Sequence, residues 1–196
     1  MEALILFIIV FVLFFSYMMK REQRNADVTY VTSKIDGEKY LVRNLPDKEN
    51  AADVIATIKK NLIKLTDYLH VHQTEHEGVT QLVERFDPSR IVENEGTDKN
   101  TTSYSINKGE KIVLCLRFRD KTKQLVPMNT LMFVSLHEMA HIMTKSIGHT
   151  DEFWDNFEYL LKKAIELGIY SPIDYAKSPV KYCGIVINST PLQFNK

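Results

Sequence analysis

The chain has 196 residues, of which 44% are hydrophobic, so it is long enough to bury the core of about one globular domain. Its 25 basic and 25 acidic residues balance, which leaves no net positive charge to attract nucleic acid. The composition excludes a disordered tail and gives no support to nucleic acid as a partner.

The N-terminal segment differs in composition from the rest. The run from Ala3 to Met19 contains no charge, proline or glycine, and as a helix it spans about 25 Å, close to the hydrocarbon thickness of a bilayer. Lys20 and Arg21 follow the run and no basic residue precedes it, so the positive-inside rule places the N-terminus outside and the main domain in the cytosol. The sequence therefore predicts a single-pass membrane protein.

The predicted organisation has three parts: a transmembrane anchor over residues 1–20, a linker over 21–27, and the main domain over 28–196. A cleaved signal peptide, which would make the domain secreted, is one alternative, but Glu2 stands where a basic region is usual. A helix buried in the core is another. The sequence also leaves open whether the membrane belongs to a cell or to a virus.

The main domain has the pattern of a small α+β fold. Alternating apolar and polar residues on both sides of Asp36-Gly37 predict a hairpin over 28–45, and apolar residues at three- and four-residue steps predict a helix over 49–69. The polar stretch 87–102 is typical of an exposed loop, whereas 111–118 is typical of a strand. His70, His72 and His76 are expected to be ordinary surface or packing residues, and Cys115 and Cys183 are too few for a disulfide framework.

The next predicted helix carries the residues with the clearest chemistry. It begins near Pro127 and ends near Gly148. His137 and His141 are four residues apart and so lie on one face, where both imidazoles can bind one ion, while Glu138 lies beside them. This H-E-x-x-H pattern is the signature of a metalloprotease, with zinc held by two helical histidines and a third ligand from elsewhere.

The third ligand is predicted to be His149. Gly148 lets the chain turn at the helix end, and Thr150 can cap a following helix. Two acidic residues of that second helix, Glu152 and Glu158, are the alternative ligands.

These motifs resemble a known family. The span from about Thr102 to Gly168, with its INKG turn, the strand KIVLCLRF, the motif LHEMAH and a histidine followed by Phe153 and Trp154, is similar to the WLM metallopeptidase domain, a relative of the SprT-like and Spartan proteases. The resemblance implies a zincin-like α+β domain with a small mixed or antiparallel sheet and a central motif helix. It also implies one Zn²⁺ per chain held by His137, His141 and His149, and Glu138 as the catalytic acid/base.

The expected function is zinc-dependent hydrolysis of a protein or peptide substrate, with Glu138 moving the proton of a metal-activated water. The strand over 111–118 is expected to offer a free edge to an extended substrate. Tyr175 and Tyr182 are candidates for stabilising the oxyanion, although packing in the C-terminal segment is the favoured interpretation of both. A zinc-binding structural or interaction module with little or no turnover is the alternative function.

Overall fold

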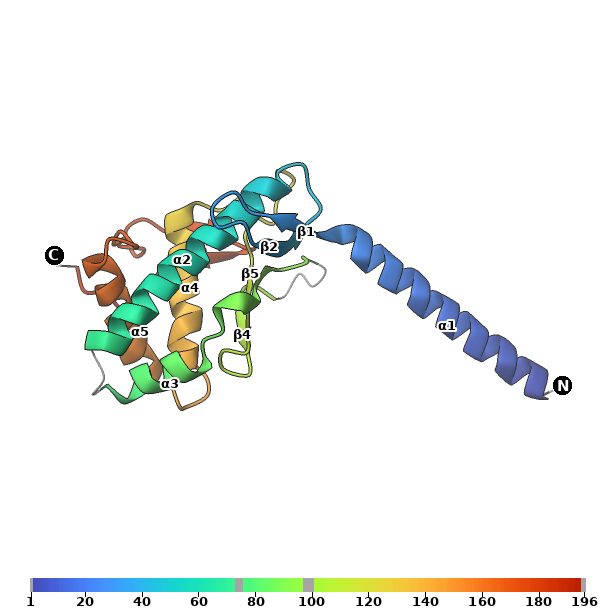
Figure 1. Cartoon of the computed structure of the whole chain (residues 1–196), viewed down its shortest axis with the longest axis horizontal. Coiled ribbons are helices and arrows are strands. Elements are labelled where there is room, and N and C mark those ends of the chain that lie inside the picture. The colour runs from blue at the N-terminus through green and yellow to red at the C-terminus, as the bar shows by residue number, and fades with distance from the viewer. Residues whose placement is uncertain (1, 73–75, 97–100, 195–196) are drawn as a thin grey trace.

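The computed structural model describes residues 2–72, 76–96 and 101–194, and, within the first helix, the side chains of residues 6–19 and 27. Helix α1, Glu2–Asp27, extends away from the other elements in Figure 1 and leads into strand β1. The predicted membrane anchor is wrong, because none of the helices within these ranges has the length and apolar character needed to cross a bilayer. The predicted single-pass localisation is wrong as well.

The predicted hairpin is confirmed. Strand β1, Val28–Thr32, pairs antiparallel with β2, Lys39–Arg43. The turn is wider than the two residues that Asp36-Gly37 suggests, because the Ser33 amide donates to the Glu38 carbonyl across it. Gly37 takes the positive φ of 76° that this loop requires.

The predicted helix over 49–69 is also confirmed, as α2, Lys48–His72. Its apolar stripe is fully buried, which explains why the three- and four-residue spacing predicted it; the stripe comprises Ile55, Ile58, Leu62, Leu65 and Leu69. The helix continues through His70 and His72, both exposed in its last turn. A short helix, α3, Glu77–Arg85, follows.

A three-stranded sheet corrects two expectations. It contains β3, Ile91–Glu93, β4, Tyr104–Ile106, and β5, Lys111–Leu114, in the order β3-β5-β4. β5 pairs parallel with β3 and antiparallel with β4, so the predicted free edge over 111–118 is wrong: β5 is the central strand, and β3 and β4 are the two edges of this sheet. The stretch 87–102 is not only an exposed loop, because it contains a 3-10 turn, Pro88–Arg90, and then β3, in which Ile91 and Glu93 are buried.

The motif helix is α4, Met128–Met143, with Pro127 at its N-cap as predicted. It packs against α2, α3 and α5, Asp151–Glu166, and most of its residues are buried (Figure 1). The predicted end near Gly148 is wrong, because Thr144 leaves the helical conformation with ψ of 134°. The seven residues that separate the two helices, 144–150, form a loop, and Thr150 caps α5 by accepting a hydrogen bond from the Phe153 amide.

The C-terminal part adds a second hairpin that the sequence did not predict. Strands β6, Val180–Tyr182, and β7, Ile185–Ile187, pair antiparallel around Cys183 and Gly184, which both have positive φ. A disulfide joins Cys183 to Cys115, just after β5. The hairpin is therefore covalently fixed to the central strand of the sheet.

Candidate metal centre

Three histidines meet at the open face of α4. His137 and His141 come from adjacent turns of the helix, and His149 comes from the loop that precedes α5. One ring nitrogen from each lies within 4.8 Å of the others, and the Nε2 atoms of His137 and His149 are 3.1 Å apart. Two nitrogens in a tetrahedral site with Zn–N bonds of about 2.0–2.1 Å lie about 3.4 Å apart, so the donor set fits a zinc ion.

The surroundings orient these imidazoles and favour the neutral form of His137 and His141. The ring of Phe153 packs against all three, with centroid distances of 4.9 Å to His137, 4.4 Å to His141 and 4.6 Å to His149. Burial lowers the pKa of His137 to about 3 and that of His141 to about 4, and the neighbouring histidines add to both shifts. A neutral imidazole has a nitrogen lone pair available for a metal.

The two acidic alternatives to His149 lie elsewhere. The Glu152 carboxylate accepts hydrogen bonds from the backbone amides of Lys145 and Ser146, at 2.8 and 3.1 Å, and from the Ser146 hydroxyl at 2.7 Å. Glu158 forms an ion pair with Lys162 on the surface of α5. The structure therefore brings His149 to the pair on α4, and leaves both glutamates outside the cluster.

The loop that carries His149 is held from two sides, which the sequence did not indicate. The Lys108 ammonium donates to the carbonyls of Thr144, Lys145 and Ser146, at 2.6, 2.6 and 3.0 Å. Glu152 binds the amides of the same loop. These three carbonyls directly follow the last helical residue, Met143, so Lys108 holds the start of the loop just beyond the end of α4.

Glu138 lies beside the histidines and is almost fully buried, at 4% exposure. Burial raises the pKa of its carboxyl to about 7, and hydrogen bonds from the side chain and backbone of Ser105 act in the opposite direction. Ser105 belongs to β4, so the edge strand orients this carboxyl. No sequence pattern pointed to Ser105, because its contact with α4 is created by the fold.

The two candidate tyrosines have different positions. Tyr182 lines the same cavity as Glu138, and its hydroxyl shares a hydrogen bond with the hydroxyl of Ser103. Burial raises the pKa of Tyr182, as does the nearby Glu138. Tyr175 is fully buried against Phe133, with ring centroids 4.7 Å apart, and it is not among the residues that line the cavity.

The cavity around these residues has a volume of about 690 Å³. One wall is β4 with its flanking residues 102–108, and another is the hairpin of β6 and β7. The floor contains the histidines and Glu138. The edge strand β4 and the three imidazoles therefore face the same cavity.

Comparisons with known proteins agree with this architecture. Residues 34–179 match the family described as WLM domain. The chain is 37% identical to uncharacterized protein R325 of Acanthamoeba polyphaga mimivirus over 195 residues, which cover 97% of this chain and 95% of that protein. It is 28% identical to uncharacterized protein 136R of Invertebrate iridescent virus 6 over 148 residues, 74% of this chain and 79% of that one.

A solved structure has a similar fold. The crystal structure of Wss1 from Saccharomyces cerevisiae superposes with a TM-score of 0.50 at 24% identity, over 63% of this chain and 83% of Wss1. At that identity the likeness concerns the fold alone, and it agrees with the predicted α+β class.

Proposed function

The chain belongs to the WLM domain family, and on that premise we propose that it is a zinc-dependent metallopeptidase that hydrolyses peptide bonds. The observation that carries the proposal is the meeting of His137, His141 and His149 with the buried Glu138 in one open cavity. Three imidazoles with a carboxyl beside them, open to a cavity, match a catalytic zinc site more closely than a closed structural one.

The three histidines would hold one Zn²⁺ per chain. When bound, the ion supplies a Lewis acid that polarises the scissile carbonyl and lowers the pKa of water toward about 7. His137 and His141 are fixed by α4, whereas His149 depends on its loop. Phe153 packs on the side of the rings that faces α5 and keeps water from that side.

Glu138 would move the proton. Its carboxylate accepts a proton from the attacking water and passes it to the leaving amine, which is general acid and base catalysis by one group. The hydrogen bonds from Ser105 hold the carboxylate toward the cavity. Tyr182 is the better candidate of the two tyrosines for stabilising the oxyanion, because its buried hydroxyl lines the cavity that contains Glu138.

The β4 edge would bind the substrate. Within the described residues β4 pairs only with β5, so the outer side of Tyr104–Ile106 can accept an extended peptide as an additional strand. Main-chain pairing of this kind requires little sequence specificity. It brings the peptide over the histidines, where Glu138 can act on it.

The test uses the full chain and matched substitutions. Glu138→Gln should retain one zinc per chain, measured by mass spectrometry, yet lose at least about 100-fold in hydrolysis of an unfolded protein substrate. His149→Ala should lose both zinc and activity. Glu158→Gln and His72→Ala, which change the same residue types outside the cluster, should leave zinc content and activity unchanged.

The outcomes separate the proposed enzyme from its alternative. Wild-type turnover by Glu138→Gln would contradict the role of this carboxyl. A parent protein that binds one zinc ion per chain but hydrolyses no substrate would favour a zinc-binding structural or interaction module. A parent protein that binds no zinc would contradict both.

A further inference from the structure

The cavity of the candidate metal centre has an apolar rim. Beyond α1, eight large hydrophobic side chains of the described residues are more than a third exposed, and five of them line this cavity. Single exposed apolar residues are ordinary on a protein surface, whereas a group gathered in one place marks a binding site. The five residues of the apolar rim, with exposed fractions from 39% to 90%, are Tyr104, Ile147, Trp154, Ile185 and Val186.

The rim residues come from three separate segments. Tyr104 is on the edge strand β4, and β7 supplies the last two. Ile147 and Trp154 stand on either side of His149 in the chain, in the loop before α5 and in the first turn of α5. The ring of Trp154 packs against that of His149, with centroids 5.7 Å apart. Apolar side chains therefore reach the cavity from several elements, and one of them contacts a candidate ligand.

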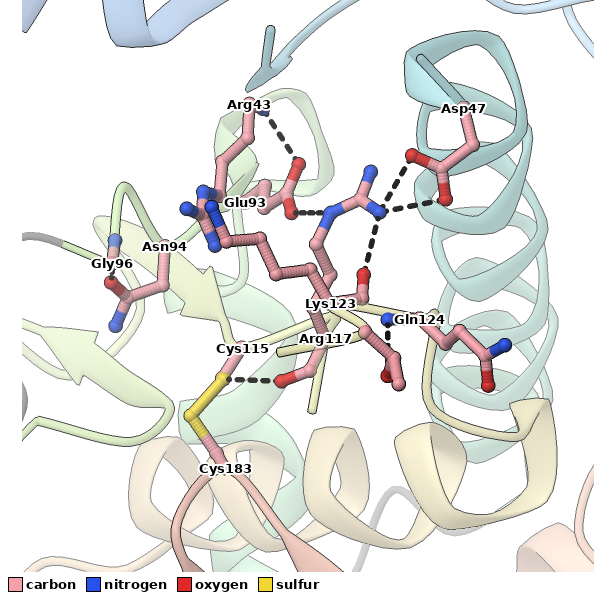
Figure 2. Close-up of polar contacts among 11 residues, drawn as sticks. Arg43, Asp47, Glu93, Asn94, Gly96, Cys115, Arg117, Lys123, Gln124 and Cys183 are labelled. Carbon is pink, nitrogen blue, oxygen red and sulfur yellow. Dashed lines mark hydrogen bonds and ion pairs between the residues drawn. A yellow bond between two sulfur atoms is a disulfide. The ribbon is translucent and has the colours of Figure 1, made fainter. Parts of the chain in front are cut away.

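The hairpin that carries Ile185 is fixed in place. Ile185 is the direct cross-strand partner of Tyr182, and such partners project from the same face of an antiparallel pair. Tyr182 is buried and lines the cavity, so Ile185 faces the cavity as well. The disulfide between Cys183 and Cys115 joins the turn of the hairpin to the end of β5 (Figure 2).

The segment that anchors this hairpin is itself held by buried charges. Arg117, two residues beyond Cys115, donates from Nε to Glu93 at 2.8 Å and from Nη1 to Asp47 at 2.7 Å (Figure 2). The loop that carries Ile147 is held as well, by three hydrogen bonds to its carbonyls. A rim on fixed segments presents its apolar side chains without the entropy cost of ordering them when a ligand binds.

The cavity offers little to a charged side chain. Within the described residues that line it, Lys108 and Glu138 are the charged groups besides the histidines. The Lys108 ammonium is engaged by three carbonyls, and Glu138 is almost fully buried. A charged ligand side chain would lose water at the rim without gaining an ion-pair partner there, whereas a large apolar side chain gains from burial.

We propose that the apolar rim selects unfolded polypeptide segments with large apolar side chains next to the scissile bond, a preference that rests on the proposed peptidase function. Large apolar side chains are mostly buried in folded proteins, so they reach the rim chiefly from a chain that has unfolded. Main-chain pairing along β4 also requires an extended chain. Both features favour unfolded over folded protein as the substrate.

The experiment compares two quenched fluorescent peptides of equal length and charge, with Leu-Phe at the centre of one and Ser-Asn at the centre of the other. The full, zinc-loaded chain should cleave the apolar peptide with a kcat/KM at least about tenfold higher, because the rim buries its central side chains. Ile185→Ser and Ile147→Ser should each reduce this ratio at least about threefold. Ile35→Ser should leave it unchanged, because Ile35 is 51% exposed, against 50% for Ile185, but lies outside the cavity.

Peptide binding is measured separately from hydrolysis. Calorimetry gives the Kd of both peptides for the zinc-loaded Glu138→Gln chain, which keeps the rim, and the zinc content of every variant is checked. Tighter binding of the apolar peptide that Ile185→Ser weakens, with no hydrolysis by the parent, would contradict the peptidase and support the rim as a peptide-binding surface. Hydrolysis of both peptides with equal kcat/KM and equal Kd would support the peptidase and overturn the preference for apolar side chains.

Two further results would overturn the proposal. The first is a ratio that falls in Ile35→Ser as much as in Ile185→Ser, because the effect would then not depend on the rim. The second is binding to phosphatidylcholine vesicles that Ile185→Ser weakens while the Kd of the apolar peptide stays unchanged. That result would assign the rim to a lipid surface.

Discussion

Lys108→Met should loosen the loop that delivers His149. The lost ammonium makes three hydrogen bonds, at 2.6, 2.6 and 3.0 Å, to the carbonyls of residues 144–146, which follow α4. Hydrogen bonds to charged groups contribute about 1.5–3 kcal/mol each when buried. Here Lys145 is exposed and Ser146 half-buried, so water replaces much of the loss. We expect the free energy of unfolding to fall by about 2 kcal/mol, and Tm by about 5 °C.

The effect on zinc should exceed that of a general loss of stability. Without Lys108 the loop spends less time in the conformation that places His149 beside His137, and the apparent affinity falls with that fraction, by about tenfold. A competition titration with a chromophoric chelator measures the zinc Kd, and thermal unfolding of the metal-free chain measures Tm. Lys121→Met is the control. A lowered Tm with an unchanged zinc Kd would refute the view that Lys108 positions the loop.

Glu152 and two glycines provide further tests. The hydrogen bonds from Ser146 and Lys145 lower the pKa of Glu152 to about 2 from its ordinary 4.5, so the stability that Glu152 contributes is complete above about pH 4.5 and is lost as the pH falls toward 2. In the metal-free chain, Glu152→Gln should reduce the change of the chemical denaturation midpoint with pH between about 2 and 4.5. An unchanged pH dependence of the midpoint would show that another group is responsible. Gly109 has φ of 116°, and a Cβ there would be 2.4 Å from the Arg85 carbonyl oxygen. Gly109→Ala should therefore cost about 3 kcal/mol, against about 1 kcal/mol for Gly37→Ala, where φ is 76° and the space is open; equal losses in urea unfolding would show that the close approach to Arg85 does not matter.

The parts of the fold that sequence reasoning predicted depend on neighbours in the chain. The apolar spacing of α2 and the start of α5 at Thr150 are local signals, and both are confirmed. The i, i+4 spacing of His137 and His141 likewise fixes their relative position on any helix. Whether these histidines bind zinc is still a prediction.

The features that were not predicted correctly from the sequence depend on contacts between segments that are far apart in the chain. The predicted end of α4 was five residues too late: the helix ends at Met143, and the loop that follows is held by Lys108, from the turn after β4, which no local pattern pairs with it. β3 was not recognised as a strand for two reasons. Its partner, β5, lies about 20 residues further along the chain, and the residues that precede and follow β3 are polar. The anchor was predicted from the length and apolar composition of the run 3–19 and from the basic residues after it, whereas none of the helices within the described residues meets the requirements of a membrane span.

The disulfide between Cys115 and Cys183 affects how the chain responds to cutting. It closes a covalent loop with a sequence separation of 68, and this loop contains α4, α5 and all three candidate ligands. A peptide bond cut anywhere inside it leaves two fragments that remain joined through sulfur. Limited proteolysis would then show an intact band on a non-reducing gel, and only a reduced sample would reveal the fragments.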